Sequence, residues 1–332
     1  MNKIWRQIIV AFLAGVLMPQ AMLRVGSWMA PTEPEPMEQT QVLTTAQTES
    51  TKPDLVVTVN YLPVLISDDR IVMMELEEYI LGVVLAEMPA SFHTEALKAQ
   101  AVAARTYALR RYVLGDRHTD KAVCTNPHCC QAYMTQEQYL KSHGSSADVL
   151  RVQEAVLATR GQILTYQGNL AETTYFACSG GRTEDAVAVW GTDIPYLQAV
   201  DSPGEENANS YWRSTYFTKE EFENALGRSL SGSPESWLGK QTFTDGSGVA
   251  TMVIGGITYT GTQLRKLLGL NSTVFTMEAD VAGILVETYG NGHRVGMSQY
   301  GADAMAQQGS NYQQILLHYY CGTRIDKWED FG

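Results

Sequence analysis

The pattern of apolar and polar residues first becomes regular at residues 55–61, where the two kinds alternate. Such alternation is typical of a half-buried strand, and residues 71–76 predict a second strand that leads into a helix. The helix is predicted over residues 77–88, because apolar residues recur from Ile80 onward at three-and-four spacing. The pattern therefore predicts two strands followed by a helix.

A second helix is predicted directly after the first, and the pair spans residues 76–111. Pro89 ends the first helix, because a residue before proline is driven away from helical geometry. Ser91 or Thr94 is expected to cap the second helix, with Glu95 in its first turn. Its many alanines let another backbone pack closely against it: Ala96, Ala99, Ala101, Ala103, Ala104 and Ala108.

The remaining pattern mixes helices and strands in irregular order. We expect further helices at residues 149–160, 218–226, 262–268, 297–308 and 312–319. We expect strands at residues 162–166, 171–177 and 283–289, hairpins within 242–259, and a loop at 190–200. A Gly168-Asn169 turn joins the first two of these strands. Because helices and strands do not alternate regularly, the predicted fold class is α+β, with mixed helices and short strands forming a cleft.

Residues 1–54 differ in composition from the rest of the chain. Lys3 and Arg6 precede an apolar run at residues 8–23, which with its flank approaches the roughly 20 residues of a bilayer span. We interpret residues 1–29 as a cytoplasmic start and a transmembrane signal anchor; a cleaved signal peptide is the alternative. The positive flank predicts that the body lies outside the cytoplasm. Residues 30–54 are rich in Pro, Thr, Glu and Gln and are expected to be a flexible linker.

The chain length limits the number of domains, and the net charge limits the class of binding partner. The chain of 332 residues is long enough for one or two domains, and its composition is ordinary for a globular protein. The formal net charge of -12 argues against nucleic acid as the main partner.

Glu87 is the candidate catalytic residue of the first helix. It precedes Met88-Pro89 among apolar neighbours, where a carboxyl group should have a raised pKa and could donate a proton at neutral pH. A carboxylate near a helix C-terminus also opposes the helix dipole, so it is unfavourable there without another role. Glu78 and Glu95 are the competing acids, and a solvated helix-end glutamate is the alternative interpretation.

Residues 117–132 form a loop rich in cysteine and histidine. Its members are the ligand types of a structural zinc site: His118, Cys124, His128, Cys129 and Cys130. Outside the cytoplasm, a Cys124–Cys130 disulfide is the alternative. For the two other cysteines, Cys178 and Cys321, the sequence leaves two alternatives open, free buried thiols or a disulfide.

Four segments in order resemble the stage II sporulation protein D family. They are residues 76–111, 176–184, 189–203 and 293–302, within a catalytic domain expected at residues 55–326. The resemblance implies a lytic transglycosylase that cuts the β-1,4 bond from N-acetylmuramic acid to N-acetylglucosamine in peptidoglycan. The C6 hydroxyl of the muramic acid attacks the anomeric carbon, and no water is consumed. The family acts in engulfment during endospore formation and prefers strands stripped of stem peptides.

The resemblance also implies roles for single residues. Glu87 matches the family's catalytic acid, which serves both proton transfers, unlike the carboxylate pair of ordinary glycosidases. The candidate substrate-binding residues supply hydroxyls, amides, a ring or close backbone approach: Ser179, Gly180, Gly181, Thr183, Tyr196, Gln198, Asp201, His293, Ser298 and Gln299. Arg294 stands where the family usually has glycine.

Family members with a metal bind zinc through two cysteines and two histidines of this loop. His118, Cys124 and Cys130 match three of these ligands. Cys129 stands at the fourth position, so either Cys129 or a shifted His128 completes the set. The zinc is expected to be structural, because four protein ligands leave no open position.

The resemblance further implies a complex with an amidase/endopeptidase and a multi-pass membrane protein, in the mother-cell membrane facing the forespore. Two alternatives compete with the transglycosylase: a glycan-binding scaffold or amidase activator without cleavage, and a hydrolytic muramidase. The products of digestion separate the two cleavage reactions.

Overall fold

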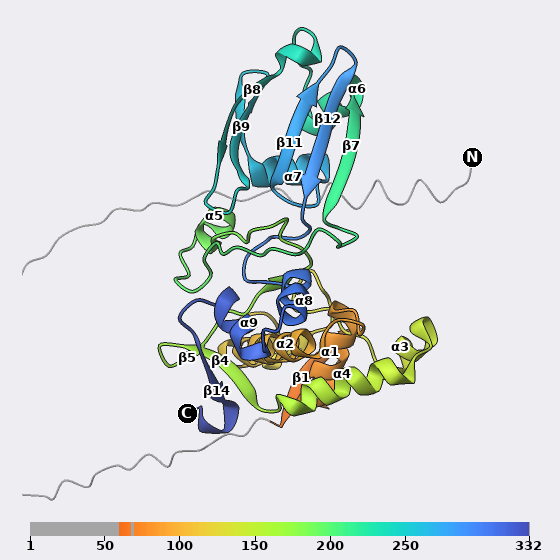
Figure 1. The fold of residues 1–332 in the computed structure, drawn as a ribbon, viewed down its shortest axis with the longest axis vertical. Helices are drawn as coiled ribbons and strands as arrows, with labels where there is room; N and C mark the ends of the chain where they lie inside the picture. The colour runs from red at the N-terminus through yellow and green to blue at the C-terminus, as the bar shows by residue number, and fades with distance from the viewer. Residues whose placement is uncertain (1–59, 68–69, 332) are drawn as a thin grey trace, which may run out of the picture. The chain divides into compact units, whose positions relative to one another are not determined.

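The computed structural model describes residues 60–67 and 70–331 (Figure 1). The predicted anchor (1–29), the predicted linker (30–54) and most of the strand expected at 55–61 lie outside this part of the chain. Among the described residues, none of the helices combines the length and the apolar character that crossing a bilayer requires.

The described part begins with a small sheet. β1 (Tyr61–Ser67) pairs antiparallel with β2 (Arg70–Glu75), and β3 (Val123–Cys124) joins β1 in parallel. The second strand confirms the prediction at residues 71–76 to within a residue. Because β3 contains Cys124, this sheet fixes the middle of the loop at residues 117–132.

Helices α1 (Leu76–Glu87) and α2 (Thr94–Leu114) confirm the predicted pair. The predicted cap of α2 is wrong, because His93 holds that place and its ring Nδ1 accepts the N–H of Glu95. A tertiary bond fixes the backbone there: the N–H of His93 donates to Asp303 at 2.6 Å. Local sequence alone does not contain that partner.

Helix α2 lies inside the larger core, and its alanines are fully buried. It packs against α1, α4 (Ser146–Ala158), α8 (Gln299–Gln307) and α9 (Tyr312–Tyr319). A buried ion pair joins Arg105 to Glu77 at 2.6 Å. The same guanidinium donates to the carbonyls of Val156 and Gln162, so one side chain ties α2 to α1, to α4 and to the strand that follows α4.

That strand, β4 (Gln162–Tyr166), forms a hairpin with β5 (Asn169–Leu170), one residue earlier than predicted because the turn is Gln167-Gly168 and not Gly168-Asn169. On its other side β4 pairs with β14 (Arg324–Lys327). Gln167 and Gly168 both have positive φ, as the tight turn requires. The strand expected over 171–177 shortens to β6 (Tyr175–Phe176), which pairs in parallel with β13 (Met297–Ser298). Helix α8 therefore begins at Gln299 rather than Met297.

The region from residue 212 to 289, here called the lobe, has its own core. It contains two three-stranded sheets and two helices, α6 (Lys219–Leu226) and α7 (Gly261–Leu268), which Figure 1 shows together. The first sheet has the order β10-β9-β8 and the second β11-β12-β7. Its strands are β7 (Trp212–Thr218), β8 (Leu238–Phe243), β9 (Val249–Ile254), β10 (Ile257–Thr260), β11 (Val274–Ala279) and β12 (Gly283–Tyr289).

Several short elements complete the fold. They are α3 (Gln136–His143), α5 (Ala186–Trp190) and the 3-10 turns η3 (Thr119–Lys121), η4 (Pro234–Ser236) and η5 (Trp328–Asp330). Helix α3 and strands β7 and β11 were not predicted from the sequence. The described residues thus form a mixed α+β fold with small sheets, as expected.

Candidate functional site

Glu87 is the last residue of α1 and is partly buried. Its Oε1 accepts the backbone N–H of Ala132 at 2.8 Å. Burial raises the pKa of Glu87, and hydrogen bonds from Ala132 and from the side chain of Gln299 oppose that shift only in part. The helix end thus presents a carboxyl group whose pKa is raised, as the sequence predicts.

Two cavities meet at this acid. The first, of about 370 Å³, is lined by Glu87 together with Tyr107, Pro127, His128, Cys129, Cys130, Gln131, Thr174, Tyr175, Phe176, Ala177, Asn291, Gly292 and His293. The second, of about 570 Å³, is lined by Glu87 together with Leu85, Ala86, Met88, Pro89, Ala90, Ser91, Met134, Tyr139, His143 and Asp148. Both volumes suit organic ligands. Glu87 can therefore contact the bond that joins two units of one ligand when one unit lies in each cavity.

Asp148 is an acid of the second cavity that sequence reasoning missed. It lies in the first turn of α4, and the hydroxyl of Tyr139 donates to it at 3.5 Å. Tyr139 stacks on His143 with ring centroids 4.3 Å apart. Ser145 is a capping residue that indicates the start of α4 in the sequence. The neighbouring sequence does not indicate that Asp148 shares a cavity with Glu87.

His293 lies between two aromatic rings in the wall of the first cavity. Its centroid is 5.6 Å from Phe176 and 5.6 Å from Trp190, the last residue of α5. Its Nδ1 accepts the N–H of Val295 at 3.1 Å, and the ring also bonds the backbone of Tyr175. Burial and then the charge of Arg265 lower the pKa of His293 to about 4. The imidazole is neutral at pH 7 and is a poor proton donor there.

Steric contacts require a glycine at position 296, in the segment 293–302 that contains His293. Gly296 has φ +85°, and a Cβ atom on it would lie 2.1 Å from the carbonyl oxygen of Thr174. A side chain there would push β13 away from β6. That pairing keeps His293 beside Phe176.

Ser179 and Gly180, predicted to contact substrate, instead bind a buried carboxylate. Glu205 accepts the hydroxyl of Ser179 and the N–H groups of Ser179 and Gly180. Glu205 also accepts the hydroxyl of Ser202 at 2.6 Å. In this conformation these groups are occupied within the protein.

Other predicted contact residues are also occupied. The hydroxyl of Thr183 bonds the carbonyls of Gln198 and Val200, and Ser298 caps α8. The hydroxyl of Tyr196 accepts the N–H of Glu172 at 2.7 Å, and its buried ring packs on Tyr166.

Gln198 and Asp201 are exposed, Asp201 in an ion pair with Arg182. Of the ten residues, His293 lines the first cavity and Gln299 bonds Glu87, whereas Gly181 and the rest line neither cavity. Their contact with a ligand stays a prediction.

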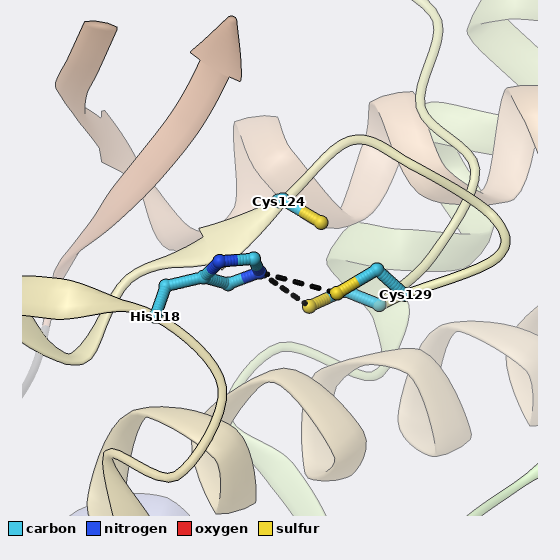
Figure 2. Close-up of side chains that lie close together, drawn as sticks. His118, Cys124 and Cys129 are labelled. Carbon is cyan, nitrogen blue, oxygen red and sulfur yellow. Dashed lines mark hydrogen bonds between the residues drawn. The ribbon is translucent and has the colours of Figure 1, made fainter. Parts of the chain in front are cut away.

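The cysteine-rich loop brings four potential metal ligands together. The ligand atoms of His118, Cys124, Cys129 and Cys130 all lie within 4.8 Å of one another. Nε2 of His118 is 3.3 Å from the sulfur of Cys129 and 3.6 Å from that of Cys130; Figure 2 shows this ring directed at the sulfurs. The cluster includes Cys129 and not His128.

The spacing fits a tetrahedral ion. Around zinc, a sulfur and a nitrogen ligand lie about 3.5 Å apart, given bond lengths of about 2.3 and 2.0 Å. All five cysteines are free thiols in the structure, Cys178 buried and Cys321 partly exposed. Burial raises the pKa of Cys130 to about 12, so this thiol stays neutral without a cation beside it.

Hydrogen bonds also join the loop to the residues around Glu87. Ala132, whose N–H donates to Glu87, lies two residues after Cys130, the last residue of the cluster. Gln131 accepts the hydroxyl of Tyr175 at 2.9 Å, and the hydroxyl of Tyr79 donates to the carbonyl of Cys124 at 3.3 Å. The cluster, helix α1 and strand β6 are therefore joined by hydrogen bonds next to the acid.

Comparison with known proteins gives consistent matches. Residues 67–166 match a family model described as stage II sporulation protein. The chain is 42% identical over 261 residues to stage II sporulation protein D of Bacillus subtilis (strain 168), covering 77% of this chain and 76% of that protein. It is 39% identical over 270 residues to the protein of the same name in Bacillus amyloliquefaciens, covering 80% and 78%. It is 28% identical over 308 residues to the amidase enhancer of Bacillus subtilis (strain 168), covering 74% of this chain and 40% of that protein.

Proposed function

The chain belongs to the stage II sporulation protein D family, and on this premise we propose that it is a lytic transglycosylase of peptidoglycan. It cleaves the β-1,4 bond between N-acetylmuramic acid and N-acetylglucosamine and leaves a 1,6-anhydromuramic end. The observation that carries the proposal is the position of Glu87, a carboxyl of raised pKa that lines two ligand-sized cavities.

The mechanism uses Glu87 twice. With one sugar in each cavity, the protonated carboxyl donates its proton to the glycosidic oxygen as the bond to the anomeric carbon breaks. The resulting carboxylate then accepts the proton of the C6 hydroxyl as that oxygen bonds the anomeric carbon. Both proton transfers need a carboxyl group of raised pKa, and burial raises the pKa of Glu87. Atoms balance without water, so the strand is cut and one end is closed into a ring.

Neighbouring groups support this assignment. Of the described residues lining the first cavity, Glu87 is the one carboxylic acid. His293 is neutral and both of its ring nitrogens are engaged, so it orients and does not transfer protons. A hydrolytic muramidase would need a second carboxylate to activate water. Asp148 is the candidate for that role, which makes the alternative directly testable.

We propose zinc as the occupant of the His118, Cys124, Cys129 and Cys130 cluster. The ion would hold the loop and supply no chemistry to the reaction, because four protein ligands complete its coordination. The loop then keeps the N–H of Ala132 directed at Glu87. A cytoplasmic start and membrane anchor at residues 1–29, a linker at 30–54 and a catalytic domain at 55–326 belong to the same proposal.

The proposed location is the mother-cell membrane, with the catalytic body outside the cytoplasm and facing the forespore. The proposed partners are an amidase/endopeptidase and a multi-pass membrane protein of engulfment. Family membership supports sporulation as the setting. The partners and the location are proposed from the resemblance to that family.

The similarity to an amidase enhancer favours a second candidate function, the stimulation of an amidase without cleavage of glycan. The two functions differ in their need for the carboxyl of Glu87. An activator that only binds glycan keeps its effect in Glu87→Gln, whereas a transglycosylase loses its reaction.

The decisive experiment digests purified denuded glycan strands and analyses the products by mass spectrometry. We expect anhydro ends from the parent protein and from Asp148→Asn, and none from Glu87→Gln. Glu78→Gln is the matched control, because Glu78 is an exposed acid of the same helix. Products that gain one water per cut, lost in Asp148→Asn, would establish hydrolysis instead.

A further inference from the structure

The first cavity is polar and, apart from its acid, offers a ligand little charge. Among the described residues that line it, none is a lysine or an arginine, and Glu87 is the one carboxylic acid. A ligand bound there meets hydrogen-bonding groups and aromatic rings. The polar side chains that are free to form new hydrogen bonds should therefore decide which uncharged ligand the cavity accepts.

Most polar side chains of this wall already bond within the protein. Gln131 accepts the hydroxyl of Tyr175 at 2.9 Å, and the hydroxyl of Thr174 donates to a backbone carbonyl at 3.1 Å. The ring of His293 accepts a backbone N–H at 3.1 Å. The two cysteines of the wall belong to the metal cluster. A ligand would have to displace these internal partners to bond the same groups.

His128 and Asn291 differ from these residues. Within residues 60–67 and 70–331, no hydrogen bond or ion pair engages the imidazole of His128 or the side-chain amide of Asn291. His128 is exposed and Asn291 is partly buried, and both line the first cavity together with Glu87. The two side chains can therefore bond a ligand without giving up a partner in the protein.

The backbone of each residue is held in place. The N–H of His128 donates to the side chain of Asn126 at 2.9 Å, and the carbonyl of Asn126 accepts the N–H groups of Cys129 and Cys130 at 3.0 and 2.9 Å. Asn291 exchanges two backbone hydrogen bonds with Cys178, of 2.7 and 3.1 Å. A ligand then has only the side-chain rotamers to order, which lowers the entropic cost of binding.

The two free side chains match the hydrogen-bonding needs of a secondary amide. A neutral imidazole has one donor and one acceptor nitrogen, and the side chain of asparagine has a donor amino group and an acceptor oxygen. A secondary amide presents one N–H and one carbonyl, which need one acceptor and one donor in return. A hydroxyl group in the same place is too small to present both groups to two separate side chains.

We propose that His128 and Asn291 recognise the acetamido group of an N-acetylated hexosamine bound in the first cavity. The amide carbonyl accepts a hydrogen bond from one side chain, and the amide N–H donates to the other. The cavity thereby discriminates against β-1,4-linked sugars that have a hydroxyl group at the same carbon. His128 and Asn291 are specificity-determining residues, and Glu87 remains the residue that transfers protons. The inference rests on the proposed function for a glycan as the ligand.

A less specific explanation is that His128 is a reserve ligand of the metal cluster. The clustered ligand atoms include the neighbouring Cys129 and not His128. Metal analysis by mass spectrometry separates the two roles: we expect an unchanged zinc content in His128→Ala and a reduced one in Cys129→Ser. Loss of zinc from His128→Ala would assign this residue to the metal and overturn the proposal.

The binding test uses a Glu87→Gln background, so that no glycan is cut. The probes are tetramers of β-1,4-linked N-acetylglucosamine and of β-1,4-linked glucose, which are both uncharged and differ in the group at C2. We expect the N-acetylglucosamine tetramer to bind about 25-fold more tightly, since two hydrogen bonds contribute about fivefold each. Equal affinity for the two tetramers overturns the proposal, whether or not any variant folds.

Single variants in the same background locate the preference. His128→Ala and Asn291→Ala should each lower the affinity ratio of the two tetramers about fivefold. His128→Gln keeps a donor and an acceptor and should retain most of the ratio. Thr119→Ala is the matched control, because Thr119 is an exposed residue of the same loop that lines neither cavity. An unchanged ratio in either alanine variant overturns the proposal.

The outcomes separate this inference from the proposed function. Cleavage to anhydro ends without any preference for the acetamido group rejects the two specificity residues and retains the enzyme. A preference that depends on His128 and Asn291, in a protein that cuts no strand, retains the two residues and rejects the transglycosylase.

Discussion

Replacement of Arg294 by the glycine usual in the family should destabilise this chain. The guanidinium is 1% exposed and donates to the carbonyls of Ser179 at 2.8 Å and Arg182 at 2.7 Å. It also donates to the carbonyl of Gly246 in the lobe and faces Glu184 at 3.6 Å, another side chain that is 1% exposed. Burial lowers the pKa of Arg294 to about 10, so the side chain remains protonated at neutral pH.

Two effects oppose each other in Arg294→Gly. Breaking a buried ion pair from one side costs about 3–5 kcal/mol, because Glu184 is left without compensation. Arg294 has φ +68°, and relief of left-handed geometry returns about 1 kcal/mol. The net loss is about 2–4 kcal/mol, which at about 2 °C per kcal/mol for a domain of this size corresponds to a fall in melting temperature of about 4–8 °C.

Thermal and denaturant unfolding measure this loss, and a double variant tests its cause. Glu184→Gln should recover stability in the Arg294→Gly background, because a neutral amide removes the unpaired charge. Ser247→Gly is the matched control, since Ser247 is exposed with φ +64° in the same hairpin as Gly246 and should keep or slightly raise stability. If Arg294→Gly is as stable as the parent protein, or if Glu184→Gln lowers its stability further, the assigned role of the ion pair is refuted.

Three further predictions concern the acid, the metal cluster and the core. Glu87→Gln should lower the cleavage rate at least 100-fold while leaving the protein folded. Because the pKa of Glu87 is raised, its protonated form is favoured in the folded state; stability is lost as pH rises through that pKa, so denaturation should show that Glu87→Gln gains on the parent between pH 4 and 8. The cleavage rate should fall over the same rise, as a pH profile will show. Removal of metal by a chelator, or Cys130→Ser, should lower the melting temperature together with the zinc content measured by mass spectrometry; equal stability with and without zinc would contradict a structural ion. Glu77→Gln should cost about 3–5 kcal/mol in denaturant unfolding, because it leaves Arg105 unpaired in the core, and a cost below 1 kcal/mol would exclude that role.

The elements that sequence reasoning found are those with a strong local signal. Helices α1 and α2 carry periodic apolar residues, and Thr218 begins α6 with a capping box. Helix α3 was missed because it buries one residue, Tyr139, and so lacks an apolar stripe, although Thr135 and Gln138 form a capping box. Strand β7 was missed because it is an edge strand with almost no buried residue.

The sequence was enough to identify the candidate acid, but not to identify which distant residues lie around it in the fold. Glu87 could be recognised because its helix, its apolar neighbours and the following proline are contiguous in the sequence. The choice between two aromatic residues of one segment could not be made: Tyr196 was expected to stack on a sugar and is buried, whereas Trp190 is exposed. Asp148 gave no local signal, because the cavity that it shares with Glu87 depends on how α4 packs against α1.

The lobe lies in the chain between two segments that line the site, and the way it is attached explains why Arg294 matters. The chain leaves after residues 176–203 and returns at Asn291, where Cys178 and Asn291 exchange two backbone hydrogen bonds of 3.1 and 2.7 Å. The lobe has further attachments away from that backbone bridge. Arg294 donates to the carbonyl of Gly246, and Glu184 accepts the hydroxyl of Thr244 and the N–H of Gly246. Because His293 and Arg294 are adjacent, the residue that restrains the lobe is bonded directly to the residue that lines the cavity. A relative with glycine at this position would lack the bond from Arg294 to Gly246, so its lobe would be held at residues 244–246 by fewer hydrogen bonds than the lobe of this chain.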